Sequence, residues 1–169
     1  MSPHAQPAPH AFDASFMRLM AEWENPMFDF AWQYLRDSRL AGDLVAVAFV
    51  RFYHACPRLG KTASPAPGLF SILAGLCQRQ AGRAVPATET DPELRALTTA
   101  IDSLSHAYKT PWLLRQCTLL SNQEIAEALT LRDEQVAQRI HRARQLIVAH
   151  LQQPSQPADV SLETISIPA

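Results

Sequence analysis

Cysteine is scarce in this sequence of 169 residues, which has three: Cys56, Cys77 and Cys117. They are odd in number, widely spaced and never form a Cys-x-x-Cys pair, which argues against a disulfide framework and against a zinc site. We therefore expect three free thiols, buried as small hydrophobic side chains.

An excess of one charge and long apolar runs are also missing. There are 15 basic and 16 acidic residues, so nucleic-acid binding would have to come from a local basic patch. No apolar run approaches the roughly 20 residues that a membrane-spanning helix needs. Residues 1–11 are rich in Pro, His and Ala and lack the apolar stretch of a signal peptide. These absences predict a soluble, cytoplasmic protein with no membrane partner.

Motifs of catalysis are missing as well. The five glycines form no Gly-rich phosphate loop, the six histidines have no metal-ligand spacing, and no Ser or Cys stands in a nucleophile motif. We expect no enzyme activity, cofactor, metal or small-molecule substrate. The 47% of hydrophobic residues is nevertheless enough to bury the core of one ordinary domain or of two small ones.

Helical periodicity dominates the first half of the chain. Apolar residues recur at helical spacing in four segments, and Pro26 suits the first turn of the second. The third segment is rich in β-branched residues, so a buried strand is its alternative interpretation. The predicted helices cover residues 12–23, 28–35, 40–53 and 69–76.

A change of composition predicts where the chain divides. Residues 80–90 contain Gly and Pro and have no periodicity, which is typical of a flexible linker. Both ends are poor in periodic apolar residues, and we expect them to be disordered. The chain is thus predicted to be all-α, with a four-helix domain at 12–79, the linker at 80–90, a second domain at 91–151, and disordered ends at 1–11 and 152–169.

The second domain should open with two helices. Asp91-Pro92-Glu93 supplies an N-cap, a first-turn Pro and a favourable acid, and this helix should run to about Leu104. The next should begin near Tyr108, with Pro111 in its first turn or at a kink.

The segment after these helices predicts a helix-turn-helix. Ser121 and Glu124 have the spacing of a capping box, which sets a helix start at Asn122. Residues 130–132 suit a tight turn, and a longer helix follows. The apolar stripes of the two helices consist of Ile125, Ala126 and Leu129, and of Val136, Ile140, Ala143 and Ile147.

Polar and basic side chains lie away from the second of these stripes. Such side chains could reach base edges and phosphates in duplex DNA. From periodicity alone, a basic face that is merely solvated is an equally good interpretation. The side chains concerned are Arg132, Gln135, Gln138, Arg139, His141, Arg142 and Arg144.

Two stretches of this segment resemble region 4 of extracytoplasmic-function sigma factors of the sigma-70 family. They are Leu-Ser-Asn-Gln-Glu-Ile-Ala-Glu-Ala-Leu at 120–129 and Arg-Ile-His-Arg-Ala-Arg at 139–144. LuxR-type domains share the Leu-Ser-x-x-Glu-Ile-Ala part, but the second stretch is closer to the sigma family. The resemblance implies that the longer helix enters the major groove of a promoter element through the side chains named above. The family's usual N-cap Ser is Arg132 here and Asp133 follows it, so we expect the helix to begin one residue late.

The first domain carries a second resemblance. Asp43-Leu44-Val45 and Phe49-Val50-Arg51 are similar to the D-L-V-Q-E-V-F-L-R stretch of sigma region 2, which grips core RNA polymerase through its Asp, Gln and Glu. Ala46 and Val47 replace the Gln and Glu. The outer face of this helix then consists of Asp43, Ala46, Val47 and Val50. We expect it to bind a protein partner through apolar contact; cover by the linker or the tail is the alternative.

Together the two resemblances imply an alternative sigma factor that docks on core polymerase and directs it to a promoter. Its partners would be promoter DNA, core RNA polymerase and an anti-sigma factor. Residues 68–76, however, lack most of the Trp, Arg and Asn side chains of the family's promoter-melting segment. The second hypothesis is therefore a sigma-like DNA-binding regulator or adaptor whose first domain binds another protein.

Overall fold

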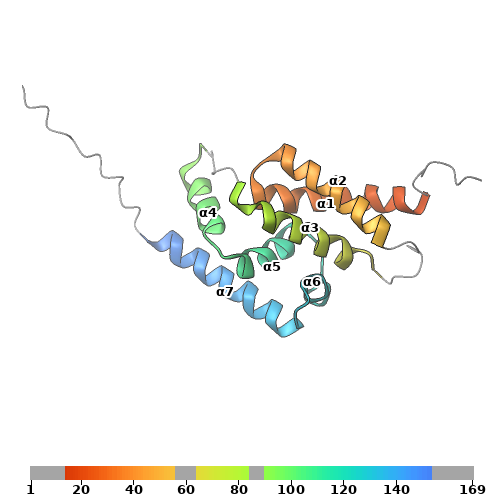
Figure 1. Ribbon diagram of the computed structural model, residues 1–169. Helices are drawn as coiled ribbons and strands as arrows, with labels where there is room; N and C mark the ends of the chain where they lie inside the picture. Colours follow the sequence, from red (N-terminus) through yellow and green to blue (C-terminus); the bar gives the residue numbers. More distant parts are fainter. Residues whose placement is uncertain (1–13, 56–63, 84–89, 154–169) are drawn as a thin grey trace, which may run out of the picture.

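The computed structural model describes residues 14–55, 64–83 and 90–153 (Figure 1). All regular structure in these ranges is helical and no strand is present there, so the all-α prediction is confirmed. The expected disordered ends, apart from residues at 152–153, and positions 84–89 of the expected linker lie outside the described residues, as does Cys56. None of the described helices is long and apolar enough to cross a membrane.

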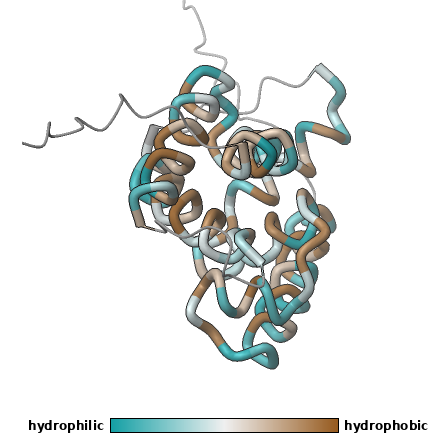
Figure 2. The backbone as a smooth tube through the Cα atoms, turned by 90° about the vertical axis from the view of Figure 1, so that its right-hand side faces the viewer, coloured by the Kyte–Doolittle hydropathy of each residue, from teal (hydrophilic) through white to brown (hydrophobic). Residues whose placement is uncertain are grey.

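The first half of the chain forms a helical hairpin and a third helix laid against it. The elements are α1 (Ala14–Leu35), α2 (Ser38–Ala55), α3 (Ala66–Gln80) and a short 3₁₀ turn, η1 (Ala81–Arg83). Aromatic rings fill the space between them: Phe16 meets Phe49 edge-on at 6.2 Å, and Phe30 meets Phe70 edge-on at 6.0 Å. Hydrophobic and hydrophilic residues alternate along the helices, as amphipathic helices around a core require (Figure 2).

The prediction of four helices in this half is wrong, because Pro26 does not start a second helix. It lies inside a continuous α1. Proline removes one backbone hydrogen bond and costs a helix interior about 3 kcal/mol. Phe16 before it and Met27 and Phe30 after it are fully buried in the same core, and this packing on both sides of the proline holds the helix together.

The segment for which a buried strand was the alternative is helix α2. Its core face consists of Ala41, Leu44, Val45, Ala48, Phe49 and Phe52. Gly68 lets α3 approach this face closely: a Cβ at Gly68 would stand 2.7 Å from Cε2 of Phe52. Close packing of α3 on α2 therefore depends on the absence of a side chain at Gly68.

The second half consists of four described helices, of which α7 is the longest. They are α4 (Pro92–Asp102), α5 (His106–Cys117), α6 (Asn122–Leu129) and α7 (Asp133–Gln152). The predicted start of α4 is confirmed, since the Asp91 carboxylate accepts from the Glu93 N–H at 2.9 Å. Pro111 is the sixth residue of α5, so the first of its two expected places, the first turn, is wrong, and the kink stays a prediction. Its ring is buried, which offsets the lost hydrogen bond.

The two halves are in contact: α3 lies against α6 and α1 against α5 (Figure 1). Polar side chains also join them, and most of these bonds belong to the Tyr34 junction, defined here as Tyr34, Asp102, His106, Lys109 and Thr110. The Tyr34 hydroxyl is hydrogen-bonded to Nδ1 of His106 at 2.7 Å and to the Thr110 hydroxyl at 3.2 Å. Lys109, 6% exposed, donates to the Tyr34 carbonyl at 3.3 Å and pairs with Asp102 at 2.8 Å.

Burial at this junction keeps neighbouring groups neutral. It raises the pKa of Tyr34 to about 12 and that of Cys77 to about 12. Both Cys77 and Cys117 are free thiols, as expected; Cys77 is buried and Cys117 half-buried.

Candidate nucleic-acid interface

Helix α6 begins with the predicted capping box. The Glu124 N–H donates to the Ser121 hydroxyl at 3.2 Å, and the Ser121 N–H donates to the Glu124 carboxylate at 2.9 Å. The Ser121 N–H bond, with the Ser121 hydroxyl bond beside it, lowers the pKa of Glu124, so the carboxylate remains ionised at neutral pH. Ser64, which precedes α3, donates to the other Glu124 oxygen at 3.4 Å and ties this helix start to the first half.

A tight turn at Thr130 separates α6 from α7. Thr130 is left-handed, with φ 54° and ψ 47°, although it is β-branched. The N–H of Leu131 donates to the Ala126 carbonyl at 2.8 Å and that of Thr130 to the Glu127 carbonyl at 3.3 Å, which is a Schellman motif. This closed turn fixes the direction in which α7 leaves α6.

Helix α7 begins at Asp133, with Arg132 as its N-cap residue. The expected late start is therefore wrong. The Gln135 side chain accepts from the backbone N–H of Arg132 at 3.0 Å. This bond satisfies one backbone donor at the helix start, which a Ser side chain at position 132 would not do. The predicted inner stripe of Val136, Ile140, Ala143 and Ile147 is buried, where α7 packs against α4, α5 and α6.

The predicted DNA-contacting side chains lie on the outside of α7. At 3.6 residues per turn, Gln138 points directly away from the buried stripe, with His141 and Arg142 on either side of it, and all three are exposed. Arg142 lies on one flank of this face and Arg144 on the other. Arg132, Arg142 and Arg144 are exposed, whereas Gln135 and Arg139 are half-buried.

Two small groups form among these side chains. On one flank, Arg142 donates to the Gln145 side chain at 3.2 Å, and Gln145 is hydrogen-bonded to Nε2 of His141 at 3.0 Å. On the other flank, Arg144 and His141 line a hollow of about 220 Å³ together with Arg115 and Asn122. Arg142 and Arg144 thus lie on different flanks of α7, and His141 takes part in both groups.

Arg115 and Gln145 were not among the residues predicted from the sequence. Arg115 donates to the Leu120 carbonyl at 2.9 Å from the last turn of α5, which brings its positive charge beside the start of α6. The position of Arg115, six residues before the capping box, could have indicated this placement, because Arg115 lies in the last turn of the helix that supports the motif. Gln145 carries no charge and gave no signal in the sequence.

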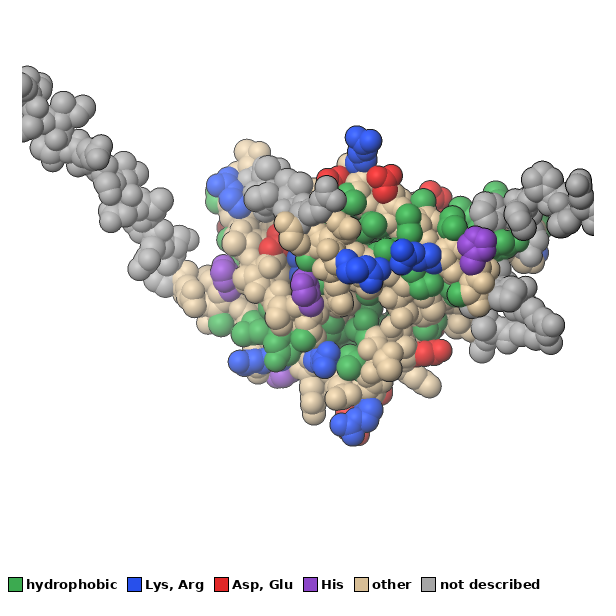
Figure 3. Space-filling model, viewed as in Figure 1, with side chains coloured by type: hydrophobic (Ala, Val, Ile, Leu, Met, Phe, Trp, Pro, Cys, Tyr) green, Lys and Arg blue, Asp and Glu red, His purple; other side chains and the backbone are tan. Residues whose placement is uncertain are grey.

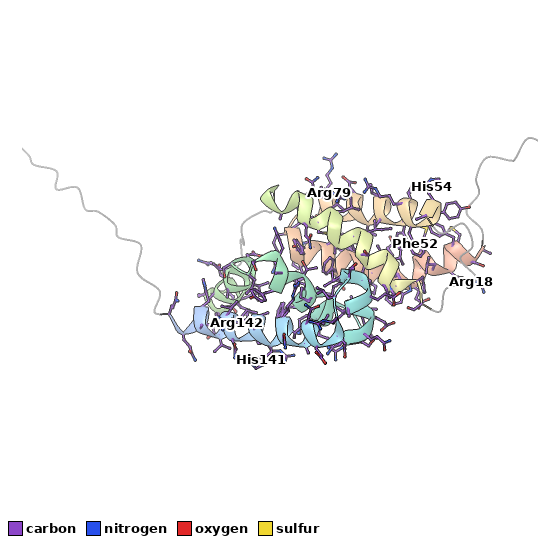
Figure 4. All side chains as sticks on the ribbon, turned by 60° about the horizontal axis from the view of Figure 1, so that its bottom comes forward. Arg18, Phe52, His54, Arg79, His141 and Arg142 are labelled. Atoms are coloured by element: carbon purple, nitrogen blue, oxygen red, sulfur yellow. The ribbon has the colours of Figure 1, made fainter. Side chains whose placement is uncertain are left out.

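The charge of this surface is locally positive. Between Thr130 and His150 there are four arginines against two acidic residues, whereas the whole chain has a formal net charge of −1. The basic side chains are spaced along the lower edge of the molecule, where α7 lies, and do not form one continuous patch (Figure 3). Figure 4 shows His141 and Arg142 on this outer side, far from Arg18 on α1.

Helix α2, which carries the predicted partner-binding residues, lies at the opposite edge of the molecule from α7 (Figure 1). Asp43, Ala46, Val47 and Val50 are all exposed, with Val47 at 38% and Val50 at 45%. Among the described residues nothing covers this face. The tail and the central linker positions, which were the alternative cover, lie outside the described residues.

Side chains that could bind a metal do not gather elsewhere. In the part of the chain that the structure describes, no three His, Cys, Asp or Glu side chains are placed to hold a metal ion. The α7 surface thus offers charged and amide donors, which suit phosphates and base edges.

Comparison with protein-family models and with curated proteins gave no match. A functional conclusion therefore has to come from the residues and geometry described above.

Proposed function

We propose that this protein is a sigma-like transcription initiation factor that binds promoter DNA through α6 and α7. Its first half would dock on core RNA polymerase, and the whole would direct the polymerase to a promoter in the cytoplasm. The observation that carries the proposal is the exposed outer face of α7, which bears Gln138, His141 and Arg142 on a helix fixed by a capping box and a Schellman turn.

Exposure is the property on which this interpretation depends. Arginines used in ion pairs with neighbouring helices would be held away from a duplex, whereas a basic face that is merely solvated would be exposed in the same way as a DNA-binding face. Here the inner stripe supports α7 and leaves the polar side chains outward. The rigid turn before α7 favours recognition, because phosphate contacts position a helix only if the helix keeps its direction.

The test begins with selection of duplex DNA from a randomised library by the full chain. Affinity for the selected sequence is then measured by fluorescence anisotropy at several salt concentrations. We expect the double variant Arg139→Ala with Arg142→Ala to bind at least about tenfold more weakly, since each base-reading Arg contributes about 1 to 3 kcal/mol. The slope of log affinity against log salt concentration should become shallower by about one for each DNA phosphate that the variant no longer neutralises.

Arg18→Ala is the matched control, because Arg18 is exposed on α1 and lies away from α7 (Figure 4). It should bind DNA as the parent chain does. Selection that yields no preferred sequence, or a double variant that binds like the control, would contradict the proposal.

A second candidate function follows from the apolar face of α2. Where the sigma family has polar contacts to polymerase, this chain has Ala46 and Val47, and a regulator or adaptor that binds another protein is the alternative. Mixing the full chain with purified core polymerase separates the two. Co-purification with core and initiation on the selected DNA favour the sigma function, whereas DNA binding without core binding favours the adaptor.

A further inference from the structure

A pocket of about 390 Å³ opens between the two halves, on the side of α1 that faces α4 and α5. This volume lies in the range typical of sites for small molecules. One wall comes from the end of α1 and the other from α4 and α5. The residues that matter for its chemistry are Trp32, Arg36, Leu94, Leu97, Trp112 and Cys117.

The walls of the pocket are mainly apolar and aromatic. Leu94 is 46% exposed and Leu97 is 37% exposed, although both line a concave surface. The rings of Trp32 and Trp112 are half-buried around them. Large apolar side chains left in solvent at a concavity are typical of a binding site, because a ligand that covers them releases water from apolar surface.

Arg36 gives this apolar pocket one cationic group. It is held in the left-handed conformation, with φ 57°, by the hydrogen bond from its N–H to the Trp32 carbonyl at 2.7 Å. Its guanidinium lies over the Trp32 ring, 5.1 Å from the centroid. The Nε atom is buried and has no hydrogen-bond partner, and no ion pair to Arg36 is present among the described residues. A buried donor without an acceptor is unfavourable, and the positive charge of Arg36 has no anionic partner among the residues that line the pocket, although Gln33, Thr98 and Gln116 bring polar side chains to it.

The thiol of Cys117 does not supply that group. Burial raises its pKa to about 11, so it is neutral at physiological pH. The missing partner would therefore have to come from a ligand.

We propose that this pocket binds an amphipathic monocarboxylate, with its carboxylate on Arg36 and its apolar part between the two tryptophans and the leucines. A carboxylate matches the planar guanidinium and would give Arg36 an anionic partner, whereas a neutral apolar molecule would leave this cation unpaired. Because the walls belong to both halves, such a ligand would stabilise their contact and act as an effector rather than as a substrate. Its binding would not require DNA.

The test uses the full chain with decanoate as the probe and decanol as its uncharged counterpart. Binding is followed by isothermal titration calorimetry and by the fluorescence of the tryptophans. We expect saturable one-to-one binding of decanoate and binding of decanol that is at least about tenfold weaker, the size of one charge-assisted hydrogen bond. Arg36→Gln should remove the difference in affinity between decanoate and decanol and leave decanol binding unchanged. Arg36→Lys should restore part of the preference for decanoate.

Two matched controls separate the pocket from general effects. Arg39→Gln changes an exposed Arg three residues from Arg36 and should bind decanoate normally. Leu94→Ala should weaken both probes, whereas Leu151→Ala, at a site equally exposed (44%) on α7, should weaken neither.

Equal affinity of the parent chain for decanoate and decanol, or no binding of either, would overturn the proposal. So would decanoate binding that survives Arg36→Gln and Leu94→Ala. If Arg36→Gln does not fold, the proposal is tested by the affinities of decanoate and decanol for the parent chain and for Leu94→Ala. Decanoate binding by a chain that ends at Gln153 but not by the full chain would assign the pocket to the chain's own last residues, and would also overturn it.

Discussion

Lys109 shows how much a single charged side chain depends on its surroundings in this protein. It is 6% exposed, its ammonium group lies 4.9 Å from the centre of the Tyr34 ring, and its one carboxylate partner among the described residues is Asp102 at 2.8 Å. A buried ion pair adds little net stability when complete, but losing one member leaves an uncompensated charge. The stability of the Tyr34 junction should therefore respond sharply to Asp102.

We expect Asp102→Asn to lower the free energy of unfolding by about 2 kcal/mol, less than for a fully buried pair because the Asp102 side chain is 30% exposed. Urea denaturation followed by circular dichroism measures the loss. Glu127→Gln, an exposed acid on α6, is the control and should change stability by no more than about 0.5 kcal/mol. Adding Lys109→Met to Asp102→Asn should recover much of the lost free energy of unfolding. Equal effects of Asp102→Asn and Glu127→Gln on stability would contradict this account.

At the scale of helices, the turn between α6 and α7 stores backbone strain. A left-handed conformation costs an ordinary L-residue about 1 to 2 kcal/mol, and Gly avoids that cost. Thr130 adopts this conformation despite its branched side chain. The strain is tolerated because the Schellman hydrogen bonds satisfy the last carbonyl groups of α6.

Thr130→Gly should accordingly stabilise the protein by about 1 kcal/mol, seen as a higher midpoint in urea denaturation. Thr99→Gly makes the same chemical change inside α4 and should destabilise by about 0.3 to 0.5 kcal/mol, because Gly is a poorer helix former than Thr. If both variants shift the midpoint in the same direction, Thr130 is not strained.

The helices themselves could largely be predicted from the sequence, because the signals that specify them are local. The capping box at Ser121 and Glu124 and the stripe on α7 depend on residues three or four apart. The continuity of α1 through Pro26 could not be predicted, because it depends on core packing from α2 and α3. The hydrogen bond between Tyr34 and His106 could not be predicted either, because these residues are 72 positions apart. Periodicity within a helix does not reveal which helices pack against each other.

On the whole-molecule scale, the two halves share contacts that two free domains on a flexible linker would not have. Buried apolar residues of α1, α3, α5 and α6 belong to one cluster, and the Tyr34 junction adds directional bonds. This arrangement should persist without a covalent connection between the halves.

A protease site inserted in 84–89 tests this directly. After cleavage we expect the two fragments to elute together in gel filtration, at the volume of the uncut chain. Cleaved protein with Tyr34→Ala is the comparison and should separate more readily, because Tyr34 carries the bonds to Thr110 and His106. Fragments of the parent chain that separate on their own would show that the halves behave as independent domains.

Helices α2 and α7 lie at opposite edges of the molecule (Figure 1). A protein seated on Val47 and Val50 would project outward, away from a duplex lying along α7, so neither occupant would obstruct the other. If both proposed partners bind, the spacing of these two helices would allow one protein and one duplex to occupy the chain at the same time.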